Sequence, residues 1–267
     1  MEEIAQGIKP EPKTLSALRP VLKNPVLTSG QERIVYEVYR GAGLTEDRAL
    51  IKTNNIRYDI TKIHPGRLGP STELGTSQEL PKTFGHYHRK IQNPNPPAGG
   101  QIQNNIEAVE VFEVISGKAW WLIQKYENEP EVINEVYLIE GLENEKIIIL
   151  SGFGVTSINP EKDKELVLAN FISLDTENVY EPYKNLQGAC YYLTENEKGE
   201  MAFEKNPNYK EAPELIKLKP REIPELGISW SKPLYEFIKT PEKFDFLNRS
   251  EKFQNILTIE NCYQIKG

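Results

Sequence analysis

The chain has 267 residues, enough for one large domain with its own hydrophobic core. Its 32 Lys and Arg and 39 Asp and Glu give a net charge of −7, with both signs spread along the sequence. This distribution argues against binding to a nucleic-acid backbone or an anionic membrane. No apolar stretch approaches the ~18 residues that span a bilayer, and the N-terminus lacks the basic start of a signal peptide. We therefore expect a soluble, cytoplasmic protein.

The N-terminal part is punctuated by Pro10, Pro12, Pro20 and Pro25, each of which removes a backbone donor. We expect an extended lead-in with at most one short helical turn. The segment ERIVYEVYR (32–40) fits both a strand and a short helix, and its sequence leaves that choice open.

From about residue 54 the pattern is that of short strands. IRYDITKI (56–63) alternates apolar and polar residues and ends in a His-Pro-Gly turn. AVEVFEVI (108–115) alternates strictly, Gly117 permits a tight turn, and we expect AWWLIQKY (119–126) to be its hairpin partner. Further strands are predicted at 82–90, 132–140, 146–152, 155–159 and 165–173.

Strands spaced at roughly ten residues and separated by Gly, Asn and Pro predict an antiparallel sandwich or barrel. The simplest interpretation is an all-β jelly-roll barrel with a few short helices and extended ends. We expect residues 1–53 to form an extension that contributes to the barrel and 54–200 to form the barrel domain. Residues 201–267, which are rich in proline and charge, form a tail that wraps the barrel or joins a dimer contact.

The two cysteines, Cys190 and Cys262, lie far apart and lack the paired spacing of a zinc site or a disulfide framework. We expect both to be reduced thiols.

Two of the three histidines form the run His86-Tyr87-His88. Side chains at i and i+2 of a strand point to the same face, so both imidazoles would reach one metal ion. The alternative is a pair of surface polar residues, since the pattern alone is weak. Glu110 and Glu113 point to opposite faces of the next strand, so only one carboxylate can join the histidines.

The runs TFGHYH (83–88) and VEVFEVISGKAWWLIQ (109–124) together resemble the first motif of the cupin-type, or archaeal-type, glucose-6-phosphate isomerases. The resemblance implies a cupin barrel with a divalent metal ion (Fe, Mn, Ni or Zn) bound by His86, His88 and Glu110. It also implies that Thr61, Thr83 and Gly85 contact the sugar phosphate.

Two departures from that pattern stand out. The loop between His88 and Glu110, which includes 92–105, is longer than usual, and a surface hairpin absorbs such length at little entropic cost. The second cupin motif normally supplies another histidine, and here Val155 occupies its place. Two histidines and a carboxylate still form a sensible site for Fe(II) or Mn(II). His64 is either a substitute ligand or a solvent-exposed turn residue.

The resemblance implies an isomerase that interconverts glucose 6-phosphate and fructose 6-phosphate, by moving a proton or a hydride between C1 and C2. In the proton route Glu110 is also the expected base. Tyr180 and Tyr183 either reach the sugar as hydrogen-bond donors or pack in the core. Two other functions compete: a non-catalytic cupin that binds a sugar or sugar phosphate, and a 2-His-1-carboxylate oxygenase. We expect a homodimer.

Overall fold

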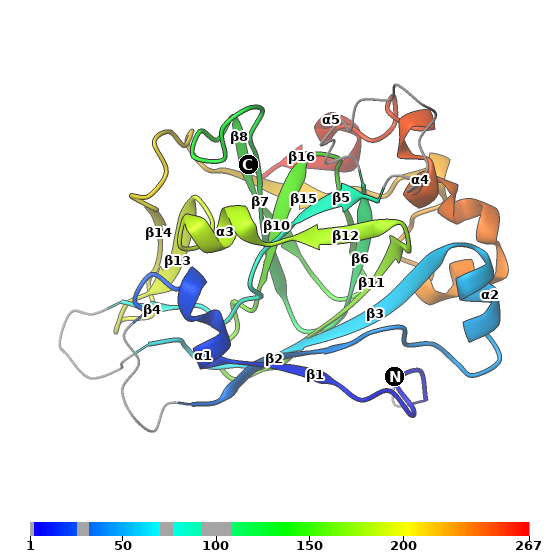
Figure 1. Cartoon of the computed structure of the whole chain (residues 1–267), viewed down its shortest axis with the longest axis horizontal. Helices are drawn as coiled ribbons and strands as arrows, with labels where there is room; N and C mark the ends of the chain where they lie inside the picture. The colour runs from blue at the N-terminus through cyan, green and yellow to red at the C-terminus, as the bar shows by residue number, and fades with distance from the viewer. Residues whose placement is uncertain (1–2, 26–31, 70–76, 92–107, 267) are drawn as a thin grey trace.

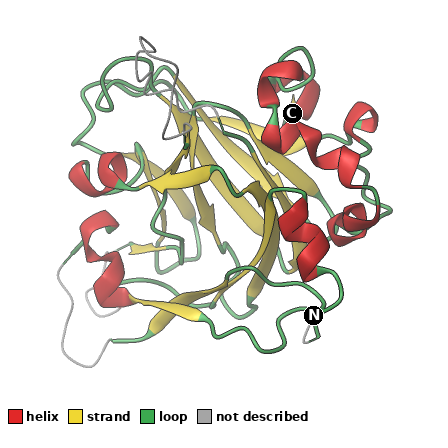
Figure 2. Ribbon diagram, turned by 45° about the vertical axis from the view of Figure 1, so that its right-hand side comes forward, coloured by secondary structure: helices red, strands yellow, loops and turns green. Residues whose placement is uncertain are grey.

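The computed structural model describes residues 3–25, 32–69, 77–91 and 108–266. Strands form the centre of the molecule and short helices lie around its periphery (Figure 2). The predicted all-β fold with a few short helices is confirmed. The predicted long loop at 92–105 lies outside the described residues.

Sixteen strands in the described part of the chain form four sheets. The largest sheet runs in the order β1 (Glu11–Thr14), β2 (Ile34–Tyr39), β3 (Ile56–Ile63), β11 (Leu166–Ser173), β6 (Glu110–Ser116) and β9 (Lys146–Ile149). The second runs in the order β10 (Phe153–Ile158), β7 (Ala119–Lys125), β8 (Glu135–Gly141), β15 (Ile216–Pro220) and β16 (Tyr263–Ile265). The two small sheets pair β12 (Thr176–Val179) with β5 (Tyr87–Lys90), and join β14 (Met201–Lys205), β13 (Tyr191–Glu195) and β4 (Gln78–Glu79).

The helices are all short. The α-helices are α1 (Leu15–Leu18), α2 (Arg48–Thr53), α3 (Glu181–Asn185), α4 (Asp245–Asn248) and α5 (Ile259–Cys262). Short 3-10 helices lie at Arg19–Val21, Pro224–Leu226, Leu234–Lys239, Pro241–Phe244 and Ser250–Lys252. None of the helices in the described ranges is long and apolar enough to cross a bilayer.

The two large sheets pack face to face. The rings of Phe112 on β6 and Trp121 on β7 lie between them, with centroids 6.1 Å apart. In the larger sheet β11 is central and pairs antiparallel with both β3 and β6, so Ile172 stands opposite Arg57 on one side and Glu110 on the other. Because paired residues point to the same face, this register decides which side chains of the three strands meet.

The prediction that 108–115 and 119–126 pair as a hairpin is wrong. β6 pairs with β11 and β9, whereas β7 pairs with β10 and β8 in the other sheet. Gly117 has φ +91°, and a Cβ there would lie 2.9 Å from the carbonyl oxygen of Glu165. The tight turn therefore exists, but it carries the chain from one sheet to the other.

The segment 32–40, left open by the sequence, is a strand over most of its length. β2 pairs with β1 on one side and β3 on the other, so its pairing partners supply the backbone hydrogen bonds that a short helix would make internally. The first and second strands thus extend the largest sheet.

The C-terminal tail covers the outer face of the largest sheet. In Figure 1 its orange helical turns lie near α2 at the right, and its red helix α5 lies beside β16 at the top. Phe244 of the tail packs on Phe171 of β11, with ring centroids 4.4 Å apart. The tail also adds β15 and β16 to the second sheet, with β15 parallel to β8. The division of the chain at 53 and 200 stays a prediction.

Candidate functional site

The two histidines of the His-x-His run point to one place. His88 lies on β5, and His86 just before it forms an isolated antiparallel bridge to Val155 of β10. The Nε2 atoms of the two imidazoles are 2.9 Å apart and the rings are nearly perpendicular, at 80°. The same-face geometry expected for residues two apart in a strand is therefore present.

Glu110 supplies a carboxylate to the same spot. Its Oε2 lies 3.1 Å from His88 Nε2, and its Oε1 accepts a hydrogen bond of 2.6 Å from the Asn170 side chain on β11. Glu113 points away, to the outer face of β6, where it pairs with Lys146 at 2.9 Å. Alternation along β6 thus separates a site carboxylate from a structural one.

The arrangement fits a divalent metal ion. A metal about 2.1 Å from each ligand places neighbouring octahedral ligands about 3.0 Å apart, close to the two measured contacts. The three ligand atoms all lie within 4.8 Å of one another. His88 Nε2 holds at most one proton, which cannot serve both of its contacts. Among the described residues, buried Glu110 Oε2 has no hydrogen-bond donor in good geometry.

The imidazole of His86 is in the protonation state that a metal ligand requires. Burial, and then the charges of His88, Arg40 and Arg57, lower the pKa of His86 well below its ordinary value. The imidazole is therefore neutral at neutral pH, the form whose nitrogen lone pair binds a metal.

Gly85 allows the chain to pass close behind the histidines. Its φ is +86°, and a Cβ there would lie 2.6 Å from both Thr156 Oγ1 and the ring of Tyr183. No residue with a side chain fits this position without displacing β10 or Tyr183. Gly85 also lines the cavity in front of His86.

Val155 stands directly opposite His86, and the two residues exchange both backbone hydrogen bonds, of 3.1 and 2.8 Å. Their side chains therefore point to the same face. The valine is fully buried. The position expected for a further histidine thus lies beside the site and is apolar.

His64 does not join the cluster. Its ring lies between two carboxylates, 3.2 Å from Glu37 and 3.0 Å from Glu165, and it belongs to no metal-ligand group found among the described residues. The substitute-ligand interpretation of His64 is therefore not supported.

A cavity that opens to solvent lies in front of His86 and Glu110. Thr61, Thr83 and Tyr180 line it as well. The Tyr180 ring lies 5.7 Å from the His86 ring, and its hydroxyl accepts a hydrogen bond of 3.1 Å from Asn178.

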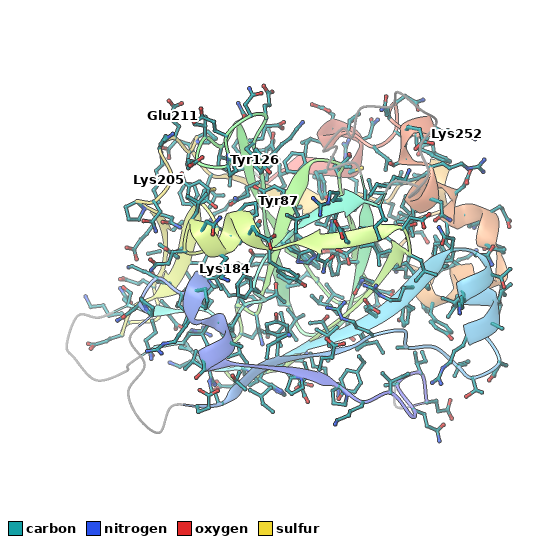
Figure 3. All side chains as sticks on the ribbon, in the orientation of Figure 1. Tyr87, Tyr126, Lys184, Lys205, Glu211 and Lys252 are labelled. Carbon is teal, nitrogen blue, oxygen red and sulfur yellow. The ribbon has the colours of Figure 1, made fainter. Side chains whose placement is uncertain are left out.

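Tyr183 lies behind the site instead. It is fully buried, and its ring centroid lies 5.4 Å from that of Tyr87. Figure 3 labels Tyr87 at the centre of the molecule with Tyr126 above it, and their rings are 5.0 Å apart. Of the two predicted tyrosines, only Tyr180 is in a position to contact a ligand in this cavity.

Three charged residues of the cavity wall were not predicted from the sequence: Arg40, Arg57 and Asp59. Asp59 is buried and accepts hydrogen bonds from Arg57 Nε at 2.9 and 3.0 Å and from the Gly41 amide at 2.9 Å. Arg40 Nη1 lies 3.4 Å away. The sequence does contain a pattern that indicates this cluster. Arg57, Asp59 and Thr61 alternate with the apolar residues of β3, so their side chains share one face of the strand.

The family model described as "Glucose-6-phosphate isomerase (GPI)" matches residues 12–210, which include every candidate site residue. No curated protein sequence matches the chain significantly.

Several solved structures are similar to the chain. One is vicilin from Corylus avellana (hazelnut), at 15% identity and TM-score 0.32, with 54% of this chain and 29% of that chain covered. An oxalate oxidase is 14% identical, with TM-score 0.33 and 55% of each chain covered. A variant of the oxalate decarboxylase from Bacillus subtilis is 14% identical, with TM-score 0.32 and coverages of 55% and 29%. In each case the match spans less than two thirds of the solved chain.

Proposed function

The chain belongs to the glucose-6-phosphate isomerase family, as its sequence resemblance predicted, and we propose that it interconverts glucose 6-phosphate and fructose 6-phosphate with a divalent metal ion. The observation that carries the proposal is the convergence of His86, His88 and Glu110 at one edge of an open cavity. Their nitrogen and oxygen donors suit Fe(II), Mn(II), Ni(II) or Zn(II).

When bound, the metal ion polarises the neighbouring carbonyl and hydroxyl oxygens of the open-chain sugar. The protein must then hold the substrate and, in the proton route, move a proton between C2 and C1. Among the residues that the structure describes, two carboxylates line the cavity, Glu110 and Asp59. Both oxygens of Asp59 are already engaged by Arg57. We therefore assign the proton transfer to Glu110, whose Oε1 is fixed by Asn170 while Oε2 faces the site. In this route Oε2 would have to release the metal ion before it takes the proton.

The sugar chain lies along the wall formed by β3 and the segment before β5. Thr61 and Thr83 offer hydroxyl groups there, and Gly85 keeps the backbone free of a side chain. Tyr180 stands at the rim, about one-third exposed, where its hydroxyl is available to a sugar hydroxyl. These roles follow from the family resemblance and from the position of each residue on the cavity wall.

Val155 favours a second candidate function, a cupin that binds a sugar phosphate without turning it over. A buried valine beside His86 offers no fourth protein ligand, which weakens metal affinity. The retained set of His86, His88 and Glu110 supports the isomerase, because simple sugar binding does not require three convergent metal ligands.

The cytoplasmic location and the homodimeric state belong to the same proposal. Light scattering coupled to size-exclusion chromatography measures the second directly, and a mass near twice the 30.6 kDa of one chain supports it.

The decisive experiment is a coupled assay of fructose 6-phosphate conversion on chelator-treated protein, with Mn(II), Fe(II), Ni(II) or Zn(II) added back singly. We expect activity to return with at least one metal and to be lost in His88→Ala. His64→Ala is the matched control, because it removes the one histidine that lies outside the cluster.

Activity that persists in His88→Ala would exclude a metal site built on this residue. If no metal restores turnover while the protein still binds the sugar phosphate, the non-catalytic cupin is the correct function.

A further inference from the structure

A pair of arginines faces the candidate metal centre across the cavity. Arg40 follows β2 and Arg57 lies on β3, and both line the cavity that contains His86 and Glu110. Their side chains are partly exposed, at 32% and 26%. Both guanidinium groups therefore reach the space that a ligand would occupy.

The buried carboxylate of Asp59 holds the pair in place. It receives Arg57 through Nε and Arg40 through Nη1. Arg40 Nε in turn donates to Glu11 at 3.2 Å. Among the described residues, neither η nitrogen of Arg57, nor Nη2 of Arg40, donates a hydrogen bond to another side chain or carbonyl. A planar guanidinium group that Asp59 holds through one nitrogen, and whose other nitrogens are free, as those of Arg57 are, is suited to bind a phosphate or carboxylate through two parallel hydrogen bonds.

The threonines predicted to contact the phosphate carry no charge. Thr83 is also partly engaged, because its hydroxyl accepts a hydrogen bond of 3.0 Å from the Ser157 amide and lies 3.5 Å from the Ser157 carbonyl. A phosphate dianion that enters a half-buried cavity needs a compensating positive charge. On this wall of the cavity the two arginines supply it. Asp59 offsets one of their charges, and Glu11, which is half-exposed and does not line the cavity, pairs with Arg40.

The register of the large sheet sets the distance between the two ends of the cavity. Arg57, Ile172 and Glu110 stand in one row across β3, β11 and β6. Two strand spacings separate the Cα atoms of Arg57 and Glu110 by roughly 10 Å. A hexose phosphate in open-chain form spans such a gap, with its reacting carbons at Glu110 and its phosphate at the arginines.

We propose that Arg40 and Arg57 form an anion subsite that binds the phosphate group of the substrate. The subsite deepens the proposed function, on which the identity of its ligand rests. It predicts that the protein selects phosphorylated over unphosphorylated sugars through charge, and that the two arginines set this preference.

Isothermal titration calorimetry of the full chain with glucitol 6-phosphate tests the subsite without turnover, because this hexitol has no carbonyl group to isomerise. We expect Arg57→Gln and Arg40→Gln each to weaken its binding by about tenfold or more, since each loses charge-assisted hydrogen bonds. Arg57→Lys keeps the charge but loses the planar fork, so its affinity should lie between those of wild type and Arg57→Gln. Unphosphorylated glucitol should bind all variants with the same, much weaker affinity.

Lys62→Gln is the matched control. It removes one positive charge from the same strand on the opposite face, where Lys62 Nζ lies 5.5 Å from the Tyr39 ring centroid. Its affinity for glucitol 6-phosphate should change by less than about twofold, because Lys62 does not line the cavity and solvent screens its half-buried charge. Circular dichroism and thermal melting establish that each variant is folded.

The subsite is refuted if the wild type does not bind glucitol 6-phosphate, or if folded Arg57→Gln and Arg40→Gln bind it as tightly as the wild type. Failure of the isomerase proposal looks different. If the isomerase proposal fails, the protein still binds glucitol 6-phosphate in an arginine-dependent way but shows no turnover. If Arg57→Gln turns over substrate with an unchanged KM, the isomerase proposal stands and the subsite is excluded.

Discussion

Val155 is the residue at which this site departs most from the motif it resembles. Its side chain points to the same face as that of His86, and Ser157, two residues further along β10, lines the cavity. The inner face of β10 therefore presents a valine where a ligand would complete the metal shell. Among the described residues, three protein donors then remain to hold the metal ion.

Val155→His should raise the affinity for divalent metal ions by about tenfold or more, because it adds a neutral imidazole beside His86. Competition with a chromophoric chelator at fixed pH measures the change. Val155→Leu is the control, since it adds volume without a donor and should leave affinity unchanged. A folded Val155→His with wild-type affinity would show that this side chain does not reach the metal.

The sequence was sufficient to find the three candidate ligands for a simple reason. Only three histidines exist, two of them are separated by one residue, and the family resemblance selects Glu110 rather than Glu113 as the carboxylate. The arginine and aspartate cluster escaped because a polar face on a strand ordinarily faces water. In β3 the face that carries Arg57 and Asp59 lines a cavity instead, and this depends on what the opposite sheet contributes.

At the scale of elements, β6 shows how one strand serves two purposes. Its inner face presents Glu110 to the candidate metal centre. Its outer face presents Glu113, which is buried, pairs with Lys146 and accepts a hydrogen bond of 2.9 Å from the Leu234 amide in the tail. The two carboxylates are three residues apart and should differ in what their loss affects.

Glu113→Gln should lower the free energy of unfolding by about 3–5 kcal/mol, because it leaves the buried Lys146 ammonium without its partner. Glu110→Gln should abolish metal binding and change the stability of the metal-free protein by about 1 kcal/mol or less, since it removes a buried charge with no fixed cation. Urea unfolding in chelator and metal titration separate the two effects. Equal losses of stability in both variants would contradict the assignment of the two faces.

Strand positions were largely readable from alternation, whereas strand partners were not. β3, β6, β7 and β11 lie within one or two residues of the predicted ranges. The expected hairpin of β6 and β7 failed because a tight glycine turn is compatible with a hairpin and with a crossing between sheets. Which of these forms depends on β9, β10 and β11, which are later in the sequence. β12 to β16 were not predicted, because they have five residues or fewer and exist through pairing with distant segments.

For the whole molecule, the main question is whether the C-terminal tail folds as one unit with the sheets. The tail is joined to the larger sheet at several points. The Leu234 amide donates a hydrogen bond to the Glu113 carboxylate, and the Tyr263 hydroxyl donates one to the Ile148 carbonyl. Phe244 packs on Phe171. These contacts cover the outer face of β6, β9 and β11. Loss of the tail would expose that apolar face, so we expect tail and sheets to unfold cooperatively.

The two cysteines report on the two parts separately, because Cys190 precedes β13 and Cys262 ends α5 in the tail. Both are buried, and burial raises the pKa of the Cys262 thiol to about 12 and that of Cys190 further. Neither thiol should react with a thiol reagent at pH 8 in the folded protein. Cys190→Ser and Cys262→Ser leave one reporter each, and across a urea series both remaining thiols should become reactive at the same concentration. Reaction of Cys262 at lower urea than Cys190 would show that the tail opens on its own and that its contacts with β6 and β9 add little to the stability of the sheets.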